Sequence, residues 1–227
     1  MQDVLEERLH DVAELVKPRL RGVLHQAAFA ASLVTGTIII ILAQGPRATT
    51  AAAVYATSVA LLFGTSAAYH RGAWSARARS VMERLDHSMI FVLIAGTYTP
   101  FALLLLDGAT RWVLFGIVWG GAAVGILARC LTPRSGRWLY TSLYLALGWV
   151  AVGVLPDIYR EGGLAVLVLL LVGGAFYSAG AVVYARKKPD PSPRWFGFHE
   201  VFHALTLLAF ACHYIAVSLA TYRYAGA

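Results

Sequence analysis

The chain has 227 residues, of which 59% are hydrophobic and 14% are charged. A soluble domain carries about 25% charged residues, so this composition argues against an ordinary water-soluble protein, and its many apolar residues exclude a disordered chain. Two cysteines exclude a disulfide framework. A net charge of +7 does not by itself indicate nucleic-acid binding in a membrane protein, and we expect no nucleic-acid partner.

Residues 1–22 are predicted to form a cytoplasmic amphipathic segment. Five acidic residues and the lack of an apolar core distinguish its first part from a cleavable signal peptide. Its apolar residues share one helical face: Leu5, Leu9, Val12 and Val16. This pattern predicts a short helix on the membrane surface or the bundle, ending near Lys17-Pro18. Residues 23–227 are predicted to form one transmembrane domain.

Seven apolar runs follow, each about long enough to cross a bilayer. None contains Asp, Glu, Lys or Arg, and each must be helical because a backbone in hydrocarbon has to satisfy its own hydrogen bonds. A β-barrel would show alternating segments of about ten residues instead. The sequence therefore predicts an all-α membrane protein, a seven-transmembrane helix bundle. The runs are Val23–Ala43, Ala48–His70, His87–Leu106, Trp112–Ala128, Trp138–Leu155, Gly163–Ala185 and Val201–Ala220.

The basic residues sort the connecting segments into two groups. Fifteen of the 19 Lys and Arg residues lie in the N-terminal segment and in the second, fourth and sixth loops, and four lie in the other loops or the C-terminal tail. Because positive charge accumulates in cytoplasmic loops, this distribution predicts a cytoplasmic N-terminus and an external C-terminus. The strict alternation also supports a count of seven spans.

Polar residues within membrane spans are the best indicators of function. His199 and His203, four residues apart, share one helical face at the cytoplasmic end of the seventh span. His70 ends the second span on that side, Asp86 begins the third there, and Ser66 lies one turn outward of His70. The orientation, which was inferred from Lys and Arg alone, thus brings all five residues to one depth.

Three neutral imidazoles suit a zinc ion and leave a fourth coordination position open for water. Asp86 is then a candidate to hold that water and accept its proton, and Ser66 a candidate to support the site by a hydrogen bond or to stabilise an oxyanion. The alternative is that each histidine only forms hydrogen bonds across the bundle. The convergence of three histidines with an acid favours the metal site.

The segment His199-Glu200-Val201-Phe202-His203 also matches the H-E-x-x-H pattern of zinc proteases. Asp107-Gly108 resembles the Asp-Gly pair of intramembrane proteases, but it would lie on the external side, about 30 Å from His199. We therefore disfavour a protease. Glu200 is interpreted as a partner of Arg194 or another cytoplasmic-side base, or as a residue near the metal.

The other histidines of the spans are interpreted as structural. His213 lies about 15 Å deeper than His203 and is interpreted as a packed, hydrogen-bonded residue, with a proton path or a cavity wall as the alternative. His25 lies near the level of the site and is interpreted as not contacting it. His87 points about 100° away from Asp86 and is interpreted as a helix-packing residue.

At these positions the sequence resembles the hemolysin III family, the bacterial branch of the progestin and adipoQ receptors. The segments that carry the resemblance are Ser66-Ala-Ala-Tyr-His70, Leu85-Asp86-His87-Ser88, Gly96-Thr-Tyr-Thr-Pro100, His199-Glu-Val-Phe-His203 and His213-Tyr214. They occur in the family's order and spacing, and the resemblance covers nearly the whole chain. The same segments fall within a broader group that includes alkaline ceramidases.

The resemblance implies a seven-helix protein of the bacterial inner membrane with a cytoplasmic N-terminus. It implies zinc held by His70, His199 and His203. Asp86 is similar to a family aspartate that contacts zinc directly or through water, and Ser66 to a serine beside it. The resemblance also suggests lipid-amide hydrolysis.

Two functional hypotheses follow. The first is a zinc-dependent hydrolase of ceramide-like lipid amides, with membrane lipids as its partners. The second is non-enzymatic, a zinc-containing receptor, lipid-homeostasis regulator or pore-forming hemolysin, and closed coordination with Asp86 as fourth ligand would favour it. Few polar residues lie outward of Ser66, which argues against a channel, and the lack of acids at mid-depth argues against a zinc transporter. The sequence leaves the oligomeric state open.

Overall fold

The computed structural model describes residues 18–132 and 136–225, and these residues are helical apart from their connections and one isolated bridge between Ser192 and Phe196. The predicted amphipathic helix falls on residues 1–17 and lies outside the described residues. The elements are α2 (Val23–Leu42), α3 (Gly45–Arg71), α4 (Ala76–Leu105), α5 (Gly108–Leu131), α6 (Arg137–Gly148), the 3₁₀ helix η1 (Trp149–Val154), α7 (Leu155–Arg186) and α8 (Phe198–Ala225).

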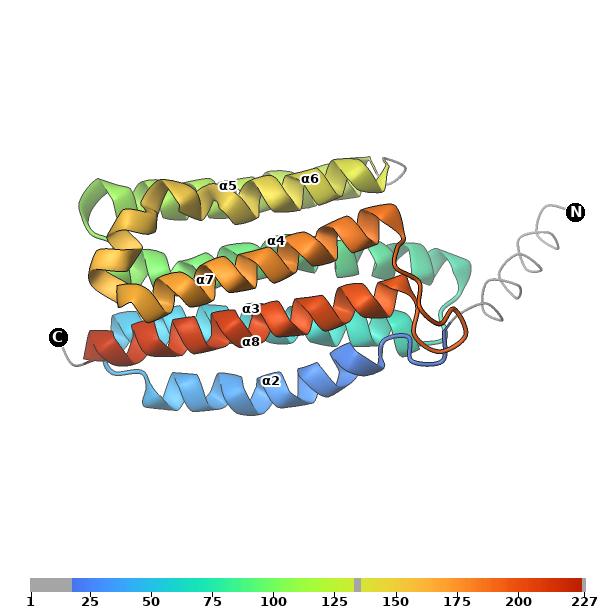
Figure 1. Cartoon of the computed structure of the whole chain (residues 1–227), viewed down its shortest axis with the longest axis horizontal. Helices are drawn as coiled ribbons and strands as arrows, with labels where there is room; N and C mark the ends of the chain where they lie inside the picture. The colour runs from blue at the N-terminus through green and yellow to red at the C-terminus, as the bar shows by residue number, and fades with distance from the viewer. Residues whose placement is uncertain (1–17, 133–135, 226–227) are drawn as a thin grey trace, which may run out of the picture.

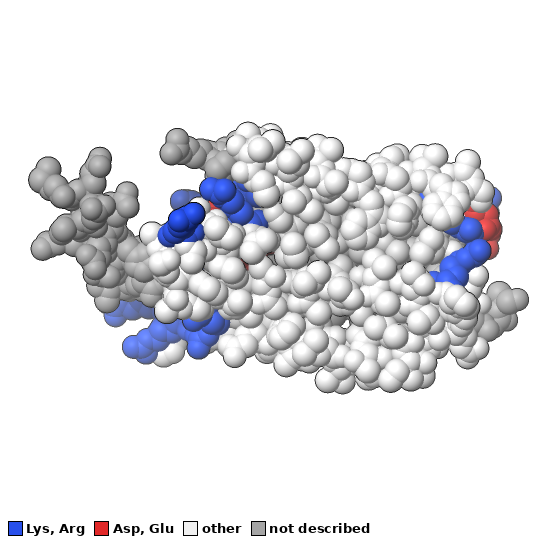
Figure 2. Space-filling view, turned by 180° about the vertical axis from the view of Figure 1, so that it is seen from behind, with Lys and Arg blue, Asp and Glu red and all other residues white. Residues whose placement is uncertain are grey.

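The helices lie side by side along one axis (Figure 1). Within the described residues, six helical stretches are long and apolar enough to cross a membrane. On the face drawn in Figure 2, charged side chains gather at the two ends of the bundle and leave an uncharged band between them. The chain is therefore a multi-pass helical membrane protein. We call the end formed by the first residues of α2, α4, α6 and α8 and the last residues of α3, α5 and α7 the basic end.

The longest of the six stretches, Arg137–Arg186, doubles back on itself. Arg137 Nη1 lies 3.4 Å from the carbonyl oxygen of Tyr184, and Trp149 donates from its indole nitrogen to Ser178 at 3.0 Å. α6 and η1 therefore run antiparallel to the second part of α7. The helical backbone is interrupted at Gly163, where φ is 80°. Glycine adopts this conformation without steric cost, and the predicted sixth run begins at this residue.

One predicted boundary is wrong in a way that matters for the site. Asp86 does not begin a helix, because α4 starts ten residues earlier at Ala76 and its N-cap Ser75 accepts a hydrogen bond from the backbone of Ala78. Residues 76–86 contain three Arg residues and Glu83, which lower the hydropathy but are good helix formers. Hydropathy marked only the apolar part of the helix.

Small residues allow close approach of the helices that carry the candidate site. A Cβ atom added at Gly96 of α4 would lie 2.1 Å from Ser58 Oγ of α3, and one added at Gly173 of α7 would lie 2.3 Å from His213 Cδ2 of α8. In membranes such contacts replace the hydrophobic driving force that packs helices in water. They hold α3 against α4 and α7 against α8.

Candidate metal centre

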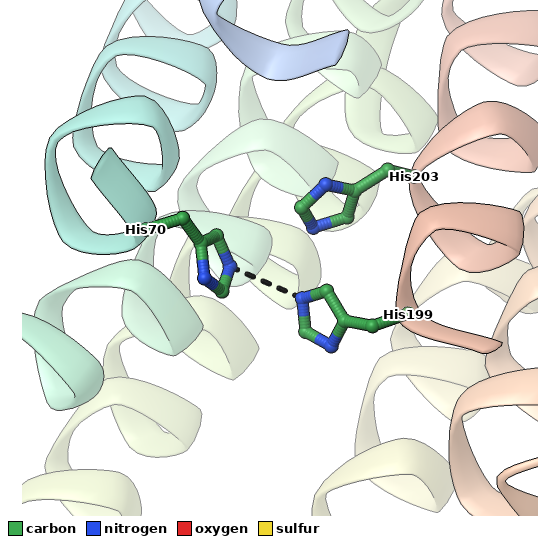
Figure 3. A group of neighbouring side chains, drawn as sticks. All are labelled: His70, His199 and His203. Atoms are coloured by element: carbon green, nitrogen blue, oxygen red, sulfur yellow. Dashed lines mark hydrogen bonds between the residues drawn. The ribbon is translucent and has the colours of Figure 1, made fainter. Parts of the chain in front are cut away.

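Three imidazoles meet near the basic end of the bundle (Figure 3). His70 lies in the last turn of α3, whereas His199 and His203 lie on successive turns at the start of α8. The Nε2 atoms of His70 and His199 are 3.1 Å apart, and one ring nitrogen from each of the three residues lies within 4.8 Å of the others. The structure thus brings together the three histidines that the sequence predicts as a cluster.

This arrangement fits a zinc ion. Two nitrogens that bind one tetrahedral zinc at 2.0–2.1 Å are about 3.3 Å apart, close to the separation of His70 and His199. A hydrogen bond between these two rings would explain that separation but would leave the position of His203 unexplained. The three ring nitrogens lie within 4.8 Å of one another, so a small side-chain adjustment brings all three to the separation that one zinc ion requires.

Asp86 and Ser66 lie beside the imidazoles, as predicted. Asp86 Oδ2 is 3.9 Å from His70 Nε2. The Ser66 hydroxyl lies within hydrogen-bonding reach of the Asp86 side chain and 2.8 Å from His25 Nδ1. A hydroxyl has one proton, and donation to Asp86 leaves none for an oxyanion. Of the two roles considered for Ser66, the geometry favours support of Asp86.

The Glu200 side chain forms an ion pair with Arg21 at the basic end. Its other carboxylate oxygen accepts a hydrogen bond from the backbone of Gly197 at 2.9 Å. The predicted pairing of Glu200 with a base at its own end of the bundle is confirmed, although the base is Arg21 rather than Arg194. With both oxygens engaged, Glu200 is poorly placed to act as the base of a zinc protease. Asp107 lies at the opposite end of the bundle and pairs with Arg111.

The Arg21–Glu200 pair joins the segment before α2 to the start of α8. Replacing Arg21 with methionine should lower the free energy of unfolding by on the order of 3 kcal/mol, because the Glu200 carboxylate, whose side chain is 1% exposed, would stay buried without its partner. Adding Glu200→Gln should recover much of this loss. Unfolding in detergent by urea measures both changes.

The matched control is Arg160→Met, which breaks an exposed pair with Asp157 at the opposite end and should cost less than about 1 kcal/mol. Equal losses for Arg21→Met and Arg160→Met would show that the buried position of Glu200 has no effect on stability.

Gly22 brings this same segment into contact with a predicted metal ligand. Its φ is 79°, and an added Cβ would lie 2.6 Å from His70 Cβ. Both the left-handed conformation and the close approach require glycine here. The backbone of Arg19 and Leu20 also donates to the carbonyl oxygens of Arg194 and Trp195 in the loop before α8. The segment before α2 therefore contacts both helices that carry the imidazoles.

A cavity of about 140 Å³ extends from the imidazoles along the bundle between α4, α6, α7 and α8. His199, His203 and Asp86 line it at the basic end, and His213 lines it farther along. A second cavity of about 60 Å³ shares Tyr98, among other residues, with the first and continues toward the opposite end. The walls are mostly apolar, so the cavity combines a polar end with a long apolar body.

Two residues interpreted above as structural, His25 and His87, line the cavity, and the helix-packing role predicted for His87 also holds. His25 forms the hydrogen bond to Ser66 and stacks on His203, with ring centroids 3.6 Å apart. His87 lines the cavity, where its Nε2 is 2.9 Å from the hydroxyl of Tyr184. The depth of His25 was the available signal. Nothing in the sequence indicated the pairing of His87 with Tyr184, which is 97 residues away.

His213 combines the two roles that the sequence analysis considered. Its Nε2 lies 3.2 Å from the carbonyl oxygen of Leu170, and the residue lines both cavities. Gly173 provides the space for its ring. The residue is hydrogen-bonded and also forms part of the cavity wall.

A family model described as Haemolysin-III related matches residues 13–214, a range that includes every candidate site residue. The chain belongs to this family. Among its curated relatives, "Hemolysin-3" from Bacillus cereus is 30% identical over 188 residues, which cover 81% of this chain and 85% of the relative. The "Hemolysin-3 homolog" of Bacillus subtilis (strain 168) is 35% identical over 146 residues, 64% of this chain and 68% of the relative.

A plant protein is also similar to this haemolysin-III-related chain. The "Heptahelical transmembrane protein ADIPOR2" of Oryza sativa subsp. japonica is 32% identical over 163 residues, which cover 64% of this chain and 70% of the relative. The hemolysin III resemblance inferred from the site segments is therefore confirmed.

Proposed function

We propose that this protein is a zinc-dependent hydrolase of ceramide-like lipid amides in the bacterial inner membrane. The observation that carries the proposal is the position of the three imidazoles and Asp86 at one end of an apolar cavity inside a membrane-spanning bundle. A hydrolytic centre at the polar end and an apolar body beyond it suit a substrate with a polar amide and a long acyl chain.

The proposed topology has seven spans, a cytoplasmic N-terminus and an external C-terminus. The fold-back at Gly163 supports seven crossings, since it divides the stretch from Arg137 to Arg186 into two antiparallel parts. The name of the rice relative, a heptahelical protein, agrees with this count. The excess of Lys and Arg at the basic end supports a cytoplasmic position for that end and for the site.

In the proposed reaction His70, His199 and His203 hold the zinc ion through their ring nitrogens. When bound, zinc supplies Lewis acidity, which polarises a carbonyl group and makes water a stronger acid. The Asp86 carboxylate accepts the proton that water loses as its oxygen bonds to the amide carbon. Asp86 then delivers this proton to the nitrogen as the C–N bond breaks, which yields a fatty acid and an amine. Ser66 orients Asp86 through their hydrogen bond.

The lipid is proposed to enter sideways from the membrane. Trp149 lines the cavity and is 41% exposed on the outer surface of the bundle, and it forms a hydrogen bond with Ser178 of α7. At this point the cavity wall is only as thick as one side chain. An acyl chain that passes between η1 and α7 would lie along the apolar body, with its carbonyl toward the imidazoles.

The test is release of fatty acid from ceramides by the purified protein in lipid nanodiscs, followed by mass spectrometry. We expect release that stops when zinc is chelated and resumes when zinc is restored. A protein with measured bound zinc that releases nothing from ceramides, acyl amines or acyl esters would overturn the proposal.

The non-enzymatic alternative is supported by one distance. Asp86 Oδ2, at 3.9 Å from His70 Nε2, is close enough for its carboxylate to become a fourth ligand. Closed coordination is typical of structural zinc. X-ray absorption spectroscopy of the zinc-bound protein distinguishes three nitrogens with a carboxylate from three nitrogens with an exchangeable water, and the first result would favour a receptor or regulator.

A further inference from the structure

His25 connects two parts of the candidate site although its helix, α2, carries none of the three candidate ligands. The side chain is buried, and its ring stacks on that of His203 of α8, with centroids 3.6 Å apart and planes 11° apart. The same side chain makes a second contact, in which His25 Nδ1 lies 2.8 Å from Ser66 Oγ of α3. One side chain thus contacts both a predicted metal ligand and the serine beside Asp86.

The hydrogen bonds fix which form of His25 is present when Asp86 is a carboxylate. A carboxylate only accepts hydrogen bonds, so the Ser66 hydroxyl donates to Asp86. The Ser66 oxygen must then accept its second bond from His25, whose Nδ1 carries the proton. The result is a directed chain from His25 through Ser66 to Asp86. It holds the serine proton toward the carboxylate.

Among the described residues, His203 has no hydrogen-bond partner of the kind that usually supports a metal-binding histidine. In most such sites the nitrogen that does not bind the metal donates to a carboxylate, a carbonyl or water, which fixes the orientation of the ring. One ring nitrogen of His203 faces His70 and His199 and the other points away from them (Figure 3). Its Nδ1 is buried and forms no hydrogen bond with any described residue. The nearly parallel His25 ring is the nearest of the aromatic rings that pack against His203 and limit its rotation.

We infer that His25 is a positioning residue for both the metal ligand His203 and the proton acceptor Asp86. This inference rests on the zinc site of the proposed function. Its ring sets the plane of His203, and its Nδ1–H directs the Ser66 hydroxyl to Asp86. The two contributions come from different parts of the side chain, so separate substitutions can remove them one at a time.

Three substitutions separate the contributions. His25→Asn keeps an N–H donor near the position of Nδ1 but has no ring, and should lower zinc affinity by about tenfold to a hundredfold while turnover at saturating zinc stays close to that of wild type. His25→Phe keeps the flat ring but not the donor. It should retain zinc affinity and lose about tenfold to a hundredfold in turnover. His25→Gln, with its donor at the position of Nε2 and no ring, should lose both.

The control is Gln26→Ala, which changes the adjacent, exposed residue of α2 and should behave as wild type. Zinc affinity is measured by competition with a chelator, ligand geometry by the visible spectrum of the cobalt-substituted protein, and turnover by fatty-acid release. A change in the cobalt spectrum is expected for His25→Asn and His25→Gln. Thermal unfolding of each variant separates these effects from a general loss of structure.

The outcomes distinguish this inference from the proposed function. If the wild-type protein binds no zinc, both are overturned. If the wild type binds zinc but does not hydrolyse lipids, the hydrolase proposal fails, and the affinities and cobalt spectra still decide the effect of His25 on His203. If the wild type binds zinc and all three variants match Gln26→Ala in affinity, spectrum and turnover, the role of His25 alone is overturned.

Discussion

Replacing His70, His199 or His203 with alanine, one at a time, should lower the affinity for zinc by at least about a hundredfold, because each change removes a ligand. Even the loss of a residue that only orients a ligand lowers metal affinity by up to about a hundredfold. Turnover on lipid amides should fall to background with it. Elemental analysis of the purified proteins, together with chelator competition, measures the effect.

The control for this series is His213→Ala. His213 lies ten residues beyond His203 on α8, which is about 15 Å along the helix, so its loss should leave zinc affinity unchanged. Equal zinc content in the wild type and all three ligand variants would mean that the cluster is held by hydrogen bonds and that any zinc binds elsewhere.

Replacing Asp86 with asparagine should reduce turnover by about a hundredfold to ten-thousandfold while zinc stays bound, because an amide keeps the size of the side chain but cannot accept the proton. Asparagine can still form a hydrogen bond with Ser66, so the packing of α3 on α4 should be little affected. Steady-state fatty-acid release and zinc content, measured on the same preparation, give the two values.

Asp107→Asn is the matched control for Asp86→Asn. The Asp107 side chain is 94% exposed at the opposite end of the bundle, and its replacement should leave turnover unchanged. Unchanged turnover in Asp86→Asn would remove the residue from the mechanism. Loss of zinc together with turnover would instead identify Asp86 as a fourth ligand and favour the non-enzymatic alternative.

The positions of the imidazoles could be predicted from the sequence because they depend on simple regularities. The spacing of His199 and His203 places them on one helical face whatever the surroundings. The alternation of Lys and Arg between loops indicated the direction in which each span crosses the membrane. Together with the position of a residue along its span, this direction gives the depth of that residue in the membrane. Depth was sufficient to bring His70 to the same level, since the last turn of α3 and the first turns of α8 both lie at the basic end.

The contacts of His25 and His87 could not be predicted because they depend on how each helix is rotated about its axis. Depth placed His25 near the site, but only the packing of α2 on α3 and α8 turns its ring toward Ser66 and His203. The hydropathy of α2 is high on all sides and does not define a buried face. Arg21 lies in a segment without regular structure, where periodicity carries no information.

The short segment that leads into α2 should tolerate no change in length. Arg21, Gly22 and His25 contact Glu200, His70 and Ser66 in turn, within a span of five residues. Insertion of a single amino acid between Gly22 and His25 would rotate the imidazole by about 100° around the helix axis and separate it from the serine. Homologous chains that share this cluster of side chains should therefore vary in loop length at the opposite end of the bundle and keep a constant residue count here.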